Sequence, residues 1–202
     1  GLILDYEQAM TVKEGSSHFN LGAHFLWIGE RTRQIKGAHV EYFRGISNPI
    51  GIKISPKISP QELLELLEVL NPKNESGRII LITRLGRGMA PKILPGLIKV
   101  VKQHQQKVLW SCDPMHGNTT RRDGYKTRIF EDIRSELSET VKTHQEHQSF
   151  LGGVHFEMTG ENVTECMGGA SNVRAQDLSR DYHTYCDPRL NYSQSLEIAF
   201  LM

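Results

Sequence analysis

The sequence predicts an α/β fold in which parallel strands alternate with helices. Five apolar, strand-like runs occur along the chain, and the first four begin about 25–30 residues apart, the length of one βα unit. The runs are nearly continuous rather than alternating, as in parallel strands covered on both faces. Such a pattern fits a doubly wound sheet, or part of a (β/α)8 barrel, which has eight strands in about 250 residues. The predicted strands span 24–28, 49–54, 78–83, 107–112 and 152–158.

Amphipathic segments fill the gaps between these runs. In "SPQELLELLEVL", Ser59 is expected to cap a helix, Pro60 to take its first position and Glu62 to complete a capping box. The leucines of this segment recur at helical spacing, so we expect them to pack on the sheet. Further helices are predicted over 94–105, 127–147 and 193–201.

Composition limits the classes of function. The 202 residues suffice for one domain, 1–202, and the formal charge of +1 comes from interspersed acids and bases. Without a basic stripe we expect no nucleic-acid partner, and without a long apolar stretch no membrane partner. Three cysteines make no even disulfide framework, which favours a reducing, cytoplasmic compartment. The opening at Gly1 suggests that the sequence starts inside a longer protein.

Charged residues cluster around the ends of the predicted strands. In a parallel α/β sheet the carboxyl ends share one edge, where active sites lie. A charge after a strand is often only a solvated loop residue, but a Lys or Arg inside an apolar run is costly unless paired. The residues concerned are Glu30, Arg31, Arg33, Lys53, Arg84, Asp113, His116, Glu157 and Glu161.

These residues divide into two chemical groups. Arg31, Lys53 and Arg84 would suit an anionic substrate that carries phosphate and carboxylate groups. His116 and Glu157, together with Asp187, offer the mixed nitrogen and oxygen ligands of a divalent Mn, Fe or Zn ion.

Other candidates are weaker. We expect His104, His144 and His147 to lie on solvated helix faces, and Cys166 to pack inside the protein. The glycine-containing "RLGRGMAPK" lacks the pattern of a phosphate-binding loop and is interpreted as an ordinary loop.

Six collinear motifs together resemble the class II (plant-type) 3-deoxy-D-arabino-heptulosonate 7-phosphate (DAHP) synthases. They are "WIGERTRQIKGAH", "NPIGIKI", "WSCDPMHGNT", "GYKTR", "GGVHFEMTGENVTECMGG" and "CDPRLNYSQSLEIAFL". The resemblance implies part of a (β/α)8 barrel, about strands four to eight. It also implies the first step of the shikimate pathway to the aromatic amino acids, in which phosphoenolpyruvate condenses with erythrose 4-phosphate to give DAHP and phosphate.

The resemblance also assigns site residues. His116, Glu157 and Asp187 match three of the family's four metal ligands, and Mn²⁺ is the expected ion, with Co²⁺ or Fe²⁺ as alternatives. Lys126 of "GYKTR" is expected to reach the phosphate of erythrose 4-phosphate. The residues expected to bind phosphoenolpyruvate are Glu30, Arg31, Lys53 and Arg84, of which Glu30, Lys53 and Arg84 are expected to act in catalysis.

One departure from the family pattern concerns the fourth metal ligand, a cysteine on an early strand, and a substrate arginine from another early strand. No motif here matches either of them. The chain therefore resembles the C-terminal half of the enzyme, and we expect it to be incomplete or inactive by itself and homo-oligomeric in the full-length protein. The alternatives are a non-catalytic fragment or paralogue that serves as an interaction module, and another metal-dependent barrel lyase or hydrolase.

Overall fold

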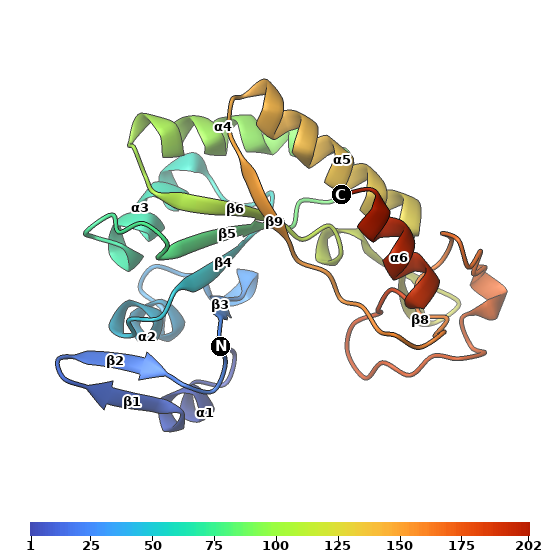
Figure 1. The fold of residues 1–202 in the computed structure, drawn as a ribbon, viewed down its shortest axis with the longest axis horizontal. Coiled ribbons are helices and arrows are strands. Elements are labelled where there is room, and N and C mark those ends of the chain that lie inside the picture. Colours follow the sequence, from blue (N-terminus) through green and yellow to red (C-terminus); the bar gives the residue numbers. More distant parts are fainter.

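A computed structural model of the chain describes residues 1–202. Its centre is a five-stranded parallel sheet in which the strands lie side by side in chain order (Figure 1). This arrangement confirms the α/β prediction and is consistent with part of a (β/α)8 barrel. The strands are β3 (Leu26–Ile28), β4 (Ile50–Ile54), β5 (Ile79–Thr83), β6 (Val108–Cys112) and β9 (Leu151–Val154).

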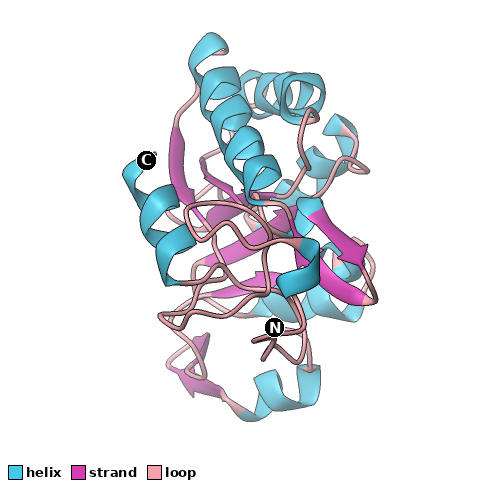
Figure 2. Cartoon of the chain, turned by 90° about the vertical axis from the view of Figure 1, so that its right-hand side faces the viewer, coloured by secondary structure: helices cyan, strands magenta, loops and turns pink.

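Helices connect the strands, and successive helices contact each other along the sheet (Figures 1 and 2). The predicted Ser59 cap is confirmed, because its hydroxyl accepts a hydrogen bond from the Glu62 amide at 3.1 Å. The predicted capping box does not form, because the Glu62 carboxylate pairs with Arg33 instead. None of the helices is both long enough and apolar enough to span a bilayer. The longer helices are α2 (Ala38–Gly45), α3 (Pro60–Leu70), α4 (Ala90–Gln103), α5 (Phe130–Glu146) and α6 (Tyr192–Phe200).

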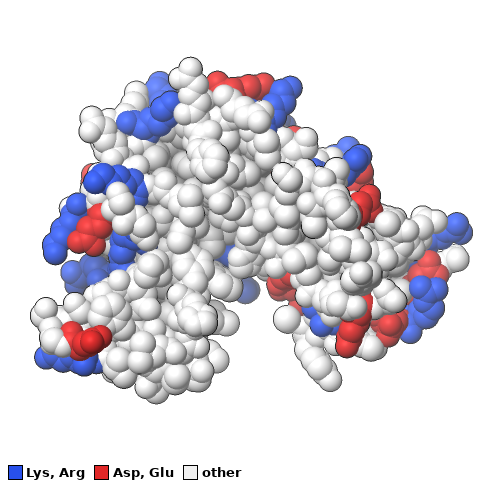
Figure 3. Space-filling view, in the orientation of Figure 1, with Lys and Arg blue, Asp and Glu red and all other residues white.

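Two apolar clusters hold these elements together. The larger lies between β3–β6 and the helices α2–α4, and includes the fully buried Ile52 and Leu66. The smaller joins α5 and α6 to the end of β6 through Phe130, Ile133 and Ile198. Removal of this apolar surface from water is the main force that fixes the sheet against the helices. Charged side chains are interspersed over both ends of the molecule in Figure 3 and are sparse across the middle of that face.

Several short elements were not predicted. The turn between β7 (Thr119–Arg122) and β8 (Tyr125–Arg128) contains Asp123 and Gly124 at positive φ of 47° and 83°, as a tight hairpin requires. These elements are α1 (Leu4–Ala9), β1 (Thr11–Glu14), β2 (Ser17–Asn20), η1 (Glu30–Thr32), η2 (His116–Asn118), β7 (Thr119–Arg122), β8 (Tyr125–Arg128) and η3 (Ala175–Asp177).

Two further predictions were wrong. The last strand of the sheet ends at Val154 and not at residue 158, because its partner β6 ends at Cys112, whose carbonyl accepts a final hydrogen bond from the His155 amide. Glu157 therefore lies in the loop after β9. His144 is buried, 1% exposed, instead of solvated, since it lies on the same stripe of α5 as Ile133 and its ring centre lies 5.4 Å from that of Trp110. Cys166 is buried as predicted.

Candidate metal and substrate site

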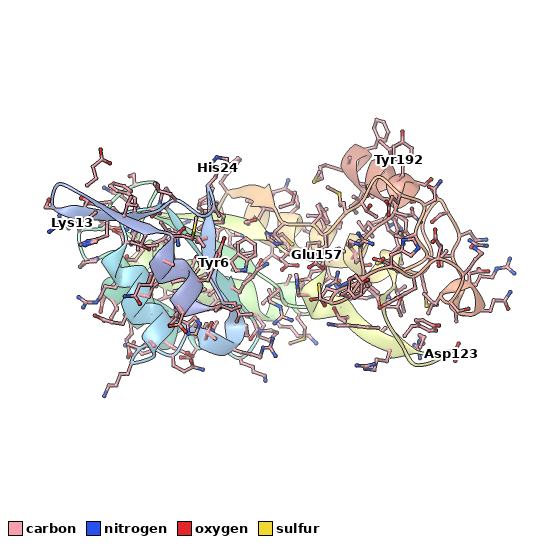
Figure 4. The ribbon with its side chains drawn as sticks, turned by 90° about the horizontal axis from the view of Figure 1, so that it is seen from below. Tyr6, Lys13, His24, Asp123, Glu157 and Tyr192 are labelled. Atoms are coloured by element: carbon pink, nitrogen blue, oxygen red, sulfur yellow. The ribbon has the colours of Figure 1, made fainter.

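Polar side chains from four strand ends and from the segment before α6 meet at one edge of the sheet. Glu157 lies centrally, between the sheet and the C-terminal segment, in the view of Figure 4. His116 follows β6 in η2, and Asp187 precedes α6, so the two Cys-Asp-Pro stretches of the chain both reach this edge. The strand-end prediction thus brought together residues that are far apart in sequence.

His116, Glu157 and Asp187 form a compact set of ligand atoms. One nitrogen or oxygen atom from each lies within 4.8 Å of the others, and all three side chains are half-buried. Nε2 of His116 is 3.4 Å from a Glu157 oxygen and 3.9 Å from an Asp187 oxygen. One imidazole and two carboxylates are ligands that ions of the Mn²⁺ and Fe²⁺ kind accept.

Asp113 holds the imidazole of His116 from behind. Its Oδ2 atom lies 2.7 Å from Nδ1 of His116, and its Oδ1 atom accepts hydrogen bonds from the amides of Met115 at 3.0 Å and His116 at 3.1 Å. The same Oδ2 atom is paired with the ammonium of Lys53. Nε2 of His116 is thereby directed toward Glu157 and Asp187, the usual arrangement behind a metal-binding histidine.

Ionisation in this cluster follows from burial and pairing. Burial raises the pKa of the fully buried Asp113, but hydrogen bonds from His116 and attraction to Lys53 outweigh it, so its pKa lies well below the usual range. Burial lowers the pKa of His116, yet Asp113 and Glu157 raise it to about 9. An ion that bound Nε2 of His116 would therefore displace a proton at neutral pH. Burial opposes ionisation of Glu157, but His116 and Arg128 lower its pKa.

Arg128 joins the two carboxylates, and the sequence did not predict this role. Its guanidinium is fully buried, 2.5 Å from a Glu157 oxygen and 3.5 Å from Asp187, and its Nε atom donates to the Thr119 hydroxyl at 3.0 Å. Lys126, from the same strand β8, lies 2.6 Å from Asp187. The motif "GYKTR" thus supplies two cations that hold the carboxylates of Glu157 and Asp187 in place.

Lys53 and Arg84 lie beside the metal group. Arg84 donates through Nη2 to the carbonyl of His116 at 2.9 Å, whereas its buried Nε atom has no hydrogen-bond partner in the protein. Lys53 lies 5.6 Å from the centre of the Trp27 ring. Burial lowers the pKa of Lys53 against the attraction of Asp113, and the charge of Arg84 lowers it further. A buried donor without a partner beside a second cation is suited to an anionic ligand.

The charged residues that follow β3 are only partly brought together. Glu30 accepts hydrogen bonds from Arg33 and from Ser55, whose hydroxyl lies 2.6 Å away. Arg33 is buried and pairs with Glu30 and Glu62. Arg31 is exposed, and its side chain forms no ion pair. Arg33, and not the Arg31 expected to bind substrate, is therefore the arginine that fixes Glu30.

A family model described as the class-II DAHP synthetase family matches residues 1–202, the whole chain. The chain belongs to this family. Two curated DAHP synthases, both called phospho-2-dehydro-3-deoxyheptonate aldolase, are similar to it over its full length. The Neurospora crassa protein is 48% identical over 221 residues, and the Mycolicibacterium smegmatis protein, AroG, is 47% identical over 209 residues. The match covers 46% and 45% of these relatives, so the chain spans about half of their length.

Proposed function

We propose that residues 1–202 are the C-terminal portion of a DAHP synthase. Its reaction would join phosphoenolpyruvate to erythrose 4-phosphate, giving DAHP and phosphate. The observation that carries the proposal is the convergence of a His–Glu–Asp ligand set and two cations, Lys53 and Arg84, at one sheet edge of a class-II family member.

The residues that would hold a divalent ion are His116, Glu157 and Asp187, with a fourth ligand from a part of the protein outside this chain. We propose Mn²⁺, with Co²⁺ or Fe²⁺ as alternatives, because the ligand set mixes nitrogen and oxygen. Such an ion, when bound, supplies a Lewis acid for the aldehyde oxygen of erythrose 4-phosphate. Asp113 and Arg128 would keep the imidazole and the Glu157 carboxylate directed at it.

The proposed work of Lys53 and Arg84 is to bind phosphoenolpyruvate. Their charges would neutralise its phosphate and carboxylate, and the unpartnered Nε of Arg84 would donate to one of these groups. C3 of phosphoenolpyruvate then forms a bond to the aldehyde carbon, water adds at C2, and phosphate leaves with cleavage of its C–O bond. Glu30 is proposed to position that water, with Arg31 as a further phosphoenolpyruvate contact.

Lys126 is proposed to bind the phosphate of erythrose 4-phosphate. Its ammonium is partly exposed, with 37% of the side chain accessible, and lies beside the ligand Asp187. This position offers a positive charge next to the ion that would receive the aldehyde. The second substrate could thus meet a cation at one end and the metal at the other.

The experiment is a phosphate-release assay of the full-length protein with both substrates and Mn²⁺. We expect turnover that a chelator abolishes and Mn²⁺ restores. Residues 1–202 alone should give none above background, because the proposed site needs ligands from elsewhere. Release that requires only one of the substrates, or that survives complete metal removal, would refute the proposal. We also place the full-length enzyme in the cytoplasm as a homo-oligomer, which fractionation and light scattering test.

A further inference from the structure

The carboxylate of Glu136 occupies an unusual place for a charged group. It projects from the middle of α5 and is 0% exposed, and no Lys, Arg or His pairs with it. Burial raises its pKa to about 7, although hydrogen bonds to the carboxylate oppose this. A buried carboxylate without a cation is costly unless hydrogen bonds satisfy its oxygens.

Both oxygens of Glu136 receive hydrogen bonds, each from a different loop of the site. Oε1 accepts from the amide of Leu85 at 2.7 Å, and Oε2 accepts from Nδ2 of Asn118 at 2.7 Å. Leu85 directly follows Arg84, and Asn118 ends the turn that begins at His116. Glu136 therefore links the loop of the substrate arginine to the turn of a metal ligand.

The two loops also touch through their backbones. A Cβ atom added to Gly117 would lie only 2.5 Å from the amide nitrogen of Gly86. Oδ1 of Asn118 accepts a hydrogen bond from the Arg87 amide at 2.9 Å, so Asn118 binds both loops at once. The contact requires glycine at 117 and a fixed orientation of the Asn118 amide.

We infer that Glu136 and Asn118 form a clamp that sets the position of Arg84 relative to His116 and thereby the affinity for the phosphate-bearing substrate. The inference rests on the proposed function, in which Arg84 binds phosphoenolpyruvate. Glu136 is a positioning residue: it touches the loops and not the substrate. His116 has a second support in Asp113, whereas the only side-chain hydrogen bond of Arg84 is the one to the His116 carbonyl. Loosening the clamp therefore affects Arg84 more than His116.

Glu136→Gln tests the clamp at constant side-chain size. The glutamine oxygen can still accept a hydrogen bond from either the Leu85 amide or Nδ2 of Asn118. The new NH₂ group then faces the other of these two donors. Asn118 cannot relieve this by turning over, because its Nδ2 atom would then face the Arg87 amide. We expect the KM for phosphoenolpyruvate to rise about tenfold, the usual size of effect when a residue that orients a binding residue is changed. The Mn²⁺ affinity of the substrate-free protein should stay at the wild-type value.

Glu139→Gln is the matched control. Glu139 lies on the next turn of α5 and accepts from the Gly88 amide at 2.7 Å, in the same loop but farther along the chain from Arg84. Its KM for phosphoenolpyruvate should equal the wild-type value. If Glu136→Gln lowers the melting temperature and leaves this KM unchanged, or weakens Mn²⁺ binding as much as it raises KM, the clamp is refuted.

A measurement on the wild-type protein covers the case in which the variant does not fold. The clamp predicts slow hydrogen exchange of the Leu85 amide, comparable to the amides of β5, in a loop where exchange would otherwise be fast. Exchange at the rate of exposed loop amides refutes the clamp. This result stands whether or not the wild-type protein turns over phosphoenolpyruvate, so it separates failure of the clamp from failure of the proposed function.

Discussion

Asp113→Asn changes one atom between His116, a proposed metal ligand, and Lys53, a proposed substrate-binding cation. The asparagine oxygen can still accept from the amides of Met115 and His116, as Oδ1 does now. The new NH₂ group replaces Oδ2 and faces two donors, the ammonium of Lys53 and Nδ1 of His116. The substitution therefore converts two charge-assisted contacts into repulsive ones and leaves Lys53 buried without a counter-ion.

The magnitude follows from burial. The side chains of Lys53 and Asp113 are 6% and 0% exposed, so solvent screens this pair very little. Removal of one partner of a buried ion pair costs about 3–5 kcal/mol, and the acceptors that remain place this variant near the lower value, about 3 kcal/mol. Because the imidazole also loses its orienting partner, we expect Mn²⁺ affinity to fall about tenfold to 100-fold.

The assays are urea unfolding and Mn²⁺ titration of the full-length protein. Asp132→Asn is the matched control, since Asp132 pairs with Arg87, whose side chain is 58% exposed, and the change should cost less than about 1 kcal/mol. Adding Lys53→Met to Asp113→Asn removes the unpaired charge and should recover part of the lost stability. The reasoning fails if Asp113→Asn costs no more than the control, or if the second substitution recovers nothing.

Three further predictions concern other parts of the site and core. Arg128→Lys keeps the charge, but a lysine cannot reach Glu157, Asp187 and Thr119 together. The Mn²⁺ affinity measured by titration should therefore fall about tenfold. An unchanged affinity contradicts the role of the guanidinium. Replacing Arg84 with Met should raise the KM for phosphoenolpyruvate in initial-rate measurements and leave Mn²⁺ binding intact; the reverse pattern contradicts its assignment to substrate. Burial lowers the pKa of His144 from 6.5 to about 4. Between these two pH values the unfolded chain therefore binds more protons than the folded protein does. The free energy of unfolding should thus fall by about 3 kcal/mol as the pH drops from 6.5 to 4. The same urea titration of His144→Gln should lack this fall, and an equal fall in both proteins contradicts it.

Much of the sheet could be predicted because its strands are continuous apolar runs whose signal is local. The residues at their ends could be grouped for the same reason, since parallel strands share one edge. His116, Glu157 and Asp187 converge as the pattern of strand ends suggested. Glu157 was nevertheless placed on a strand, because the run of apolar residues continues past the point where β6 stops providing a partner.

The hydrogen bonds and ion pairs that orient the proposed ligands could not be predicted, because the residues that form them are distant in sequence. Arg128 meets carboxylates 29 and 59 residues further along the chain, and only the folded loops bring them together. Glu136 accepts from an amide 51 residues earlier, while its own helical position looks like any acid on an amphipathic helix. The burial of His144 could not be predicted either, because its neighbours in the sequence are polar and give no local sign of it.

His116, Glu157 and Asp187 are proposed to bind a divalent ion beside a substrate site. The most direct measurement is the Mn²⁺ affinity of full-length wild-type protein and its Glu157→Gln variant, followed by electron paramagnetic resonance of free Mn²⁺. Glu161→Gln is the control, because Glu161 is an exposed acid four residues away, 68% accessible. We predict that Glu157→Gln weakens binding on the order of 100-fold while the control matches the wild type. Equal Mn²⁺ affinity in all three proteins would contradict the account.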